Sequence, residues 1–380
     1  MTSAPTVSDA GSLVDSDQIT FTTHGRAETE RMRWFQAGLI AEMQARDYAY
    51  LPGEVDRVRL VLNFTNGDDP QTFRRKAQAI FVCGIIESDE EPDDIFRTVY
   101  PLMVRSMSNV MLYIVNVDDR IDAHFMTMEQ GHYVVTKRPD ESDQEFFAEL
   151  FGRLEPLATS RLVINNIYVP DLPEELWQGD EITVELSEAG RKLDAMNLLP
   201  APFPIHEILN ERDLRHVKRL FGMGGLSYGN LSARKDDTRF WMSASGVNKG
   251  QLNDIGRDIL LVTDYDPAQN AMVLSVPPHV EPRRVSVDAI EHFMIYREHP
   301  SVGAIIHVHA WMDGIESTHI NYPCGTRELA IAVSELVRHE PDPSRAVVGL
   351  RNHGLTITGH SLPEIFERME GRIIPQVPMS

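Results

Sequence analysis

Apolar residues in the first half of the chain recur with the spacing of alternating helices and strands. Apolar residues at helical spacing predict an amphipathic helix over residues 26–47, namely Met32, Phe35, Leu39, Ile40 and Met43. Similar patterns predict helices at 92–107 and 143–157, and strands at 58–64, 79–86, 111–117, 133–137 and 161–169. The alternation is typical of an α/β domain, which a strand and a short helix within 181–197 would complete.

The second half opens with a helical pattern at 205–221 and then contains mainly short strands. Strand pairs are predicted at 228–233 with 239–242 and at 259–263 with 271–274, and two further strands at 346–350 and 355–358. Helices are predicted at 288–298 and 328–339. The prolines of residues 199–204 predict a linker, and the small polar residues of 1–18 predict a disordered tail without a signal peptide. We therefore expect one domain at 19–198 and a second at 205–380.

Composition and charge narrow the class of protein and its partners. The chain has 42% hydrophobic and 24% charged residues, which is typical of globular domains in water. It has no apolar run of the roughly 20 residues that a membrane span needs. The net charge of −21 argues against nucleic acid or an anionic membrane as partner. Cys83 and Cys324 are the only cysteines, so we expect no disulfide framework and a cytoplasmic protein.

Three histidines form the pattern that carries the most chemistry. His307 and His309 lie two residues apart in an apolar run, so in a strand both would point to the same side. His353 follows in a second segment that is bounded by turn residues. A histidine pair of this kind more often lies on a half-exposed face of a strand and binds no metal. Three imidazoles with one open position, however, are typical of a catalytic Zn²⁺ or another divalent first-row metal.

The motifs around these histidines resemble those of the class II aldolase/adducin family. In chain order they are Gly229-Asn230-Leu231-Ser232, Ser243-Ala244-Ser245-Gly246, an acid before the His307 pair, Gly325-Thr326-Arg327-Glu328-Leu329, and Asn352-His353-Gly354-Leu355. The resemblance covers about 205–380 and does not reach the N-terminal half. It implies an α/β/α domain in which helices cover a central, mostly antiparallel sheet, preceded here by the separate α/β domain.

The resemblance implies roles for several of these side chains. It assigns metal ligands to His307, His309 and His353, and a carboxylate that acts as ligand or base to Asp288. The aldolases carry Glu at this position, whereas the phosphopentose 4-epimerase branch carries Asp. The candidate acid is Tyr322, with Tyr228 and Tyr296 as alternatives. The long C-terminal helix that bears catalytic residues in the family has no counterpart after Glu370.

The same resemblance predicts where an anionic group would bind. The family's phosphate-binding turns match Gly229, Asn230, Ser245, Gly246 and Ser286. Glycines let the backbone approach an anion, and Asn and Ser add neutral donors. A substrate carboxylate, helped by Arg283 or Arg284, is the alternative. One helical turn after Asp288, Glu291 and His292 share its helix face, so either could take the place of Asp288. Glu291 is otherwise expected to be a surface charge, and His292 a packed or solvent-exposed side chain.

These residues together favour a divalent-metal-dependent lyase of the aldolase type, or an epimerase. Its expected substrate is a small anionic hydroxy-carbonyl compound, sugar-like and either phosphorylated or carboxylated, that reacts through a metal-stabilised enediolate. Zn²⁺ is the expected ion, with Fe²⁺, Mn²⁺ and Co²⁺ as alternatives. Two other functions stay open: a non-haem Fe(II) oxygenase, and a non-catalytic assembly module like adducin. The resemblance also implies a homo-oligomer, which in the family is a tetramer.

Overall fold

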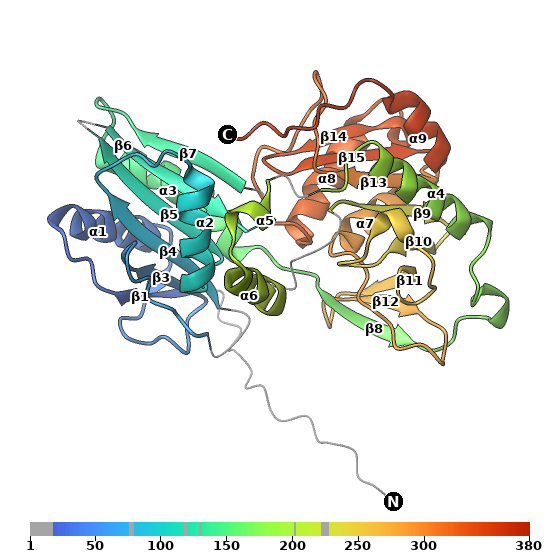
Figure 1. The fold of residues 1–380 in the computed structure, drawn as a ribbon, viewed down its shortest axis with the longest axis horizontal. Helices are drawn as coiled ribbons and strands as arrows, with labels where there is room; N and C mark the ends of the chain where they lie inside the picture. The colour runs from blue at the N-terminus through green and yellow to red at the C-terminus, as the bar shows by residue number, and fades with distance from the viewer. Residues whose placement is uncertain (1–17, 76–79, 118–119, 129–130, 201–202, 222–227) are drawn as a thin grey trace, which may run out of the picture. The chain divides into compact units, whose positions relative to one another are not determined.

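The computed structural model describes residues 18–75, 80–117, 120–128, 131–200, 203–221 and 228–380 (Figure 1). The backbone divides into two compact units. One comprises 1–93, 105–125 and 135–151, and the other 94–104, 126–134 and 152–380. Among the described residues, no helix is both long and apolar enough to cross a membrane.

The N-terminal part of the chain forms a seven-stranded sheet in the order β2-β1-β3-β4-β5-β6-β7. The pairs β1–β2, β1–β3, β3–β4 and β4–β5 are parallel. Helix α1 buries Met32, Phe35, Leu39 and Met43 of the predicted face, whereas Ile40 is half-buried. The elements are β1 (Thr20–Gly25), α1 (Glu30–Ala45), β2 (Ala49–Tyr50), β3 (Leu60–Phe64), β4 (Phe81–Ser88), α2 (Ile95–Ser106), β5 (Val110–Val117), β6 (Arg120–Thr127), β7 (Gly131–Lys137) and α3 (Asp143–Thr159).

The C-terminal part forms an eight-stranded sheet in the order β14-β15-β13-β9-β10-β11-β12-β8. Among the strand pairs that the structure describes in this sheet, only β12–β8 is parallel, so the predicted mixed α/β fold with a mostly antiparallel sheet is confirmed. Its strands are β8 (Asn165–Val169), β9 (Asn230–Arg234), β10 (Phe240–Ser243), β11 (Ile259–Asp266), β12 (Ala271–Ser275), β13 (Ala304–Val308), β14 (Val347–Leu350) and β15 (Gly354–Gly359).

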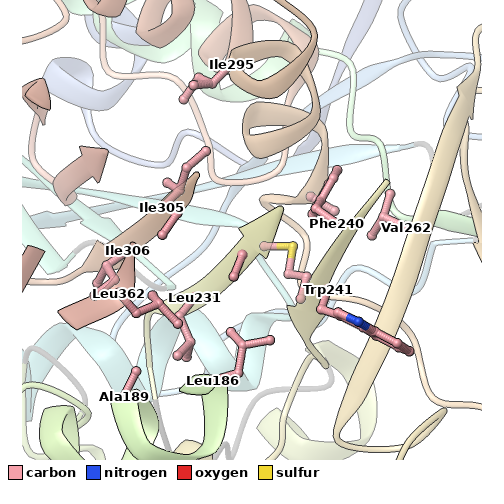
Figure 2. Close-up of a cluster of buried hydrophobic side chains, with 14 of the residues drawn as sticks. Leu186, Ala189, Leu231, Phe240, Trp241, Val262, Ile295, Ile305, Ile306 and Leu362 are labelled. Carbon is pink, nitrogen blue, oxygen red and sulfur yellow. The ribbon is translucent and has the colours of Figure 1, made fainter. Parts of the chain in front are cut away.

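Helices cover both faces of this sheet. The α-helices that follow β8 in the chain are α4 (Glu181–Ala195), α5 (Ile205–Ile208), α6 (Glu211–Phe221), α7 (Ala289–Glu298), α8 (Arg327–His339) and α9 (Leu362–Met369). Figure 2 shows Leu231 of β9 and Ile306 of β13 pointing toward Leu186 and Ala189 of α4 and Leu362 of α9. Helix α7 covers the opposite face, where its side chains form hydrogen bonds with β9 and β15.

Some elements differ from the prediction because tertiary packing decides them. Residues 181–195 form the single helix α4, which begins at a capping box of Asp180 and Thr183. Together with β8, α4 belongs to the C-terminal sheet and core, although the sequence groups both with the first domain. The helix expected over 205–221 is divided into α5 and α6, because Asn210 accepts a hydrogen bond from the Asp213 N–H and starts a new helix.

Candidate functional site

His307 and His309 stand where strand β13 ends. In the register of the sheet, His307 lies between Asn230 of β9 and Thr356 of β15. The His307 Nδ1–H donates to the Leu355 carbonyl at 3.0 Å, which leaves Nε2 with its lone pair. His309 follows two residues later, and its ring centroid is 5.2 Å from that of His307. The predicted strand and the common side of the pair are both confirmed.

His353 reaches the pair from the turn between β14 and β15. The preceding Asn352 has a φ of 58°, a left-handed conformation that asparagine tolerates. A Cβ atom on the following Gly354 would lie 2.2 Å from the Val308 carbonyl oxygen, so only glycine allows this close approach. The His353 ring centroid lies 4.7 Å from that of His307 and 4.8 Å from that of His309.

The three imidazoles are neutral and have nitrogens available as ligands. Burial lowers the pKa of His307, although the nearby Asp288 opposes this effect. Burial holds the pKa of His309 and of His353 well below the usual value. Buried nitrogens of all three rings have no hydrogen-bond partner among the described residues, and one ligand atom from each lies within 4.8 Å of the others. This donor set fits a metal ion.

Asp288 precedes helix α7 and is held by three donors. Its Oδ2 accepts from the Asn230 Nδ2 at 2.7 Å. Its Oδ1 accepts from the Cys324 Sγ at 3.0 Å and from the Gly325 N–H at 3.1 Å. Burial by itself would raise the pKa of Asp288, but His307 and other neighbours lower it below the usual value. Asp288 is therefore ionised, and it does not belong to the compact set formed by the histidines.

A buried polar layer continues from Asp288 along α7. The Thr356 hydroxyl donates to the Glu291 carboxyl at 2.5 Å. The Ser232 hydroxyl forms hydrogen bonds with His292 Nδ1 at 2.7 Å and with the Tyr296 hydroxyl at 2.9 Å. Burial, with help from Asp288, raises the pKa of Glu291 to about 8. Burial lowers the pKa of His292 to about 3.

The expectation of a surface charge at Glu291 is wrong, because only 2% of this residue is exposed. His292 is buried, which is one of the two environments expected for it. The signal that could have found the buried Glu291 is the helical spacing from Asp288, which places both on one face of α7.

The predicted anion-binding residues fall into two places. A Cβ on Gly229 would lie 2.5 Å from the His307 carbonyl oxygen, so this glycine allows β9 to approach β13. Asn230 donates to Asp288, as described above. Ser245 and Gly246 instead line a cavity of about 490 Å³ together with Arg283.

Backbone hydrogen bonds connect this cavity to the segment that precedes α7. The Ser245 N–H donates to the Arg284 carbonyl at 2.9 Å, and the Ser286 N–H donates to the Ser243 carbonyl at 3.2 Å. Ser286 is itself buried. Arg283 lies 3.8 Å from the Asp258 carboxylate, which also lines the cavity. The cavity therefore offers hydroxyl, backbone and guanidinium donors, opposed by one carboxylate.

Residues 214–313 match the family model of the Class II Aldolase and Adducin N-terminal domain. This part of the C-terminal half is therefore similar to class II aldolase and adducin domains. Three curated relatives are each named methylthioribulose-1-phosphate dehydratase. That of Citrobacter koseri is 26% identical over 173 residues, covering 38% of this chain and 78% of the relative. The Leptospira biflexa relative is 30% identical over 112 residues, covering 29% of this chain and 49% of the relative. The Pseudomonas aeruginosa relative is 36% identical over 106 residues, covering 27% of this chain and 46% of the relative.

The chain thus spans about half the length of the second and third of these relatives. Among solved structures, YgbL from Klebsiella pneumoniae matches with 18% identity and a TM-score of 0.33, covering 50% of this chain and 84% of that chain. His307 and His309 lie inside the matched family region, whereas His353 and Tyr322 lie beyond it.

Two tyrosines of the class II aldolase-like half stand near the polar groups described. The Tyr228 ring centroid lies 5.4 Å from that of His309. Tyr322 is partly buried and lies two residues before Cys324. Burial raises the pKa of Tyr322, and the carboxylates of Glu328 and Glu335 raise it further. The Tyr322 hydroxyl therefore keeps its proton at neutral pH.

Proposed function

We propose that this protein is a divalent-metal-dependent lyase or epimerase that acts on a small phosphorylated or carboxylated hydroxy-carbonyl compound. The observation that carries the proposal is the convergence of His307, His309 and His353, which are neutral and offer unpaired buried nitrogens. The dehydratase name of the relatives is that of a lyase, and it supports this reaction class. Dehydration of a phosphorylated ketose is therefore the lyase reaction to examine first.

In this proposal, the three histidines hold the ion, for which Zn²⁺ suits an all-imidazole set. The bound ion would polarise a carbonyl or hydroxyl oxygen of the substrate and so stabilise an enediolate. His307 is fixed for this role by its hydrogen bond to the Leu355 carbonyl, which sets the tautomer and aims Nε2. Neutral ligands leave the positive charge of the ion available to the substrate.

Asp288 supplies negative charge beside the histidines. Its low pKa makes the carboxylate a weak proton acceptor, so we assign it to holding charge, as ligand or neighbour, in preference to acting as general base. Tyr322 keeps its proton, which suits a proton donor. The cavity lined by Ser245, Gly246 and Arg283 would bind the phosphate or carboxylate group of the substrate. We also propose a homo-oligomer, as in the family.

The metal content of protein purified without chelator tests this proposal. We expect near-stoichiometric zinc in the wild type and its loss in His309→Ala. His206→Ala is the matched control, because His206 is an exposed histidine of α5 and should leave the metal in place. Iron in place of zinc would favour the oxygenase. Absence of metal from the wild type would overturn the proposal and favour a non-catalytic module like adducin.

A substrate screen then separates the reactions. Phosphorylated ketoses, including methylthioribulose 1-phosphate, are incubated with the zinc-loaded protein, and dehydration, cleavage and epimerisation are followed by NMR. Turnover by the wild type and by His206→Ala, but not by His309→Ala, supports the metal-dependent reaction.

A further inference from the structure

The segment that follows α9, residues 371–380 (the tail segment, red in Figure 1), contacts the stretch of chain just after His309. The Trp311 N–H donates to the Ile374 carbonyl at 2.8 Å, and the Ile374 N–H donates to the Trp311 carbonyl at 2.8 Å. This antiparallel pair is an isolated bridge outside the strands of the sheet. Because Trp311 lies two residues after His309, the tail segment is attached close to one histidine of the cluster.

The tail segment has a second contact at the turn that carries His353. The side chain of Asn352, the residue before His353, forms two hydrogen bonds with the backbone of Ser380. Asn352 Nδ2 donates to a main-chain oxygen of Ser380 at 3.0 Å, and Asn352 Oδ1 accepts from the Ser380 N–H at 2.7 Å. Asn352 is buried, so this paired contact fixes a side chain that neighbours a histidine of the cluster.

The part of the tail segment between the two contacts is short and restricted. Only residues 375–379 separate Ile374 from Ser380, and two of them are Pro375 and Pro378. Proline fixes its own φ and reduces the conformational entropy of the free chain. A short, restricted connection of this kind loses less entropy on docking than a flexible one. The tail segment therefore joins the stretch after His309 to the turn of His353.

The other contacts between these two stretches end one residue before Asn352. The loop after Trp311 pairs with β14, where the Gly349 N–H donates to the Glu316 carbonyl at 2.8 Å and the Thr318 N–H donates to the Gly349 carbonyl at 2.9 Å. The Arg351 N–H donates to the Thr318 hydroxyl at 3.0 Å. At the next residue, Asn352, the printed side-chain bonds are those to the tail segment. The tail segment thus continues this connection up to the residue that precedes His353.

A metal ion and the tail segment would constrain the same two parts of the chain. The ring centroids of His309 and His353 lie 4.8 Å apart, and an ion bound by both rings would hold them at a fixed spacing. Contacts that already hold ligands near their bound geometry reduce the entropy lost on binding. If tail docking favours metal binding, metal binding must favour tail docking by the same factor.

We propose that Asn352 is a positioning residue and that the tail segment is a clasp for the metal site. Docking of the tail segment on Trp311 and Asn352 holds the stretches of His309 and His353 together, so that metal binding and tail docking are cooperative. This inference rests on the proposed function, because it concerns the same metal site. It adds a device that sets how tightly, and for how long, the protein retains its ion.

Two variants that remove the same contact from opposite sides test this inference. Asn352→Gly removes the amide but tolerates the left-handed φ of 58°. A chain that stops after Gln376 lacks Ser380 but keeps the Ile374 pair. Each should bind Zn²⁺ at least about fivefold more weakly than the wild type in chelator competition, mainly because zinc is released faster. The two changes combined should weaken binding no more than either alone, since they break one shared contact.

Two control variants separate the clasp from general effects of the substitutions. Asn197→Gly replaces an exposed asparagine that has a φ of 56° after α4. Met379→Ala shortens an exposed side chain next to Ser380 and leaves the backbone in place. Both should bind and release Zn²⁺ like the wild type. Urea unfolding in chelator shows that each variant is folded, and if Asn352→Gly is not, the shortened chain is judged by the same criterion.

Two further readouts report on the site itself and not on stability. The visible spectrum of the Co²⁺-loaded protein should change in Asn352→Gly, because the His353 ring is no longer held in one orientation, and should stay unchanged in Asn197→Gly. In the wild type, Zn²⁺ should slow amide hydrogen exchange in residues 374–380, as reciprocal coupling requires.

The outcomes distinguish this inference from the proposed function. If the wild type binds no Zn²⁺, the proposed function falls, and the clasp falls with it. If the wild type binds Zn²⁺ but both variants bind and release it equally well, the metal site stands and only the clasp is wrong. Additive losses in the combined variant, or tail exchange that Zn²⁺ does not slow, would likewise show that Asn352 and the tail segment do not act together on the site.

Discussion

The two faces of strands β9, β13 and β15 are both fully buried, yet they are built from different kinds of side chain. The face toward α4 and α9 is apolar, with Leu231, Ile306 and Ile357 at 0%, 2% and 1% exposure. The face toward α7 carries mainly polar residues at the alternate positions of the same strands, namely Asn230, Ser232, His307 and Thr356, with Ile305 as an apolar exception.

The difference separates the side chains that stabilise the domain from those that form its candidate functional site. Burial of a large aliphatic side chain contributes about 1.5–3 kcal/mol. Burial of a polar group costs free energy unless the group finds a partner. On the α7 side, Glu291 Oε2, His292 Nε2 and His307 Nε2 have no partner among the described residues. An interface that leaves such groups unpaired is a poor source of stability, which agrees with the role proposed for it.

Adjacent substitutions in β13 give the largest expected effects and test this comparison directly. Ile306→Ala removes apolar contacts with α4 and α9 and should lower the free energy of unfolding by about 2–5 kcal/mol, with zinc affinity unchanged. His307→Ala should abolish zinc binding, because two imidazoles remain. It should leave the stability of the metal-free protein nearly unchanged, since it also removes an unpaired buried nitrogen. Urea unfolding in chelator and zinc calorimetry measure the two quantities.

The distinction between the two faces is wrong if Ile306→Ala weakens zinc binding or if His307→Ala destabilises the metal-free protein. Loss of zinc affinity in Ile306→Ala, measured under conditions where the variant is folded, would mean that the apolar face also holds the site. Strong destabilisation of metal-free His307→Ala would mean that the polar face contributes to the fold. His206→Ala, at an exposed position, controls for loss of a histidine as such.

The sequence predicts the apolar face better than the polar one, for a physical reason. Periodic burial is a local signal, so the helix α1, the strand with His307 and His309 and the turn with His353 could all be predicted. Motif resemblance added Asp288. Hydrogen bonds between elements are not local: that Asn230 donates to Asp288, and that Thr356 meets Glu291, depends on how α7 packs on the sheet.

A pH series on Glu291→Gln sharpens the electrostatic side of the comparison. The pKa of Glu291 rises from 4.5 to about 8 on folding. Between these values, the folded state keeps a proton that the unfolded state has lost, so the stability present below pH 4.5 falls as pH rises toward 8. The slope from one such group is about 1.4 kcal/mol per pH unit. Glu291→Gln cannot titrate and should lose this slope in urea unfolding at pH 5, 6, 7 and 8 in chelator.

A carboxyl group on the same helix provides the control for that series. Glu298 is bound by Arg338, and this hydrogen bond lowers its pKa. Glu298→Gln should therefore keep the wild-type slope between pH 5 and 8. Parallel curves for wild type and Glu291→Gln would show that Glu291 is ionised in the folded protein, and its neutral hydrogen bond with Thr356 would have to be abandoned.

Two neighbouring residues of β9 provide the finest test, since their side chains lie on opposite faces of the sheet. Ser232→Ala leaves His292 Nδ1 and the Tyr296 hydroxyl without their shared partner and should cost about 1–3 kcal/mol. Ala233→Ser places a hydroxyl group on the apolar face, where it lacks a partner, and should cost a similar amount. Both are measured by urea unfolding in chelator. If the faces differ as described, a hydroxyl group raises the free energy of unfolding at residue 232 and lowers it at residue 233. An increase in stability in Ser232→Ala would instead mean that the hydrogen bonds of the polar layer do not offset the cost of burying it, and that the layer persists only for the chemistry that it positions.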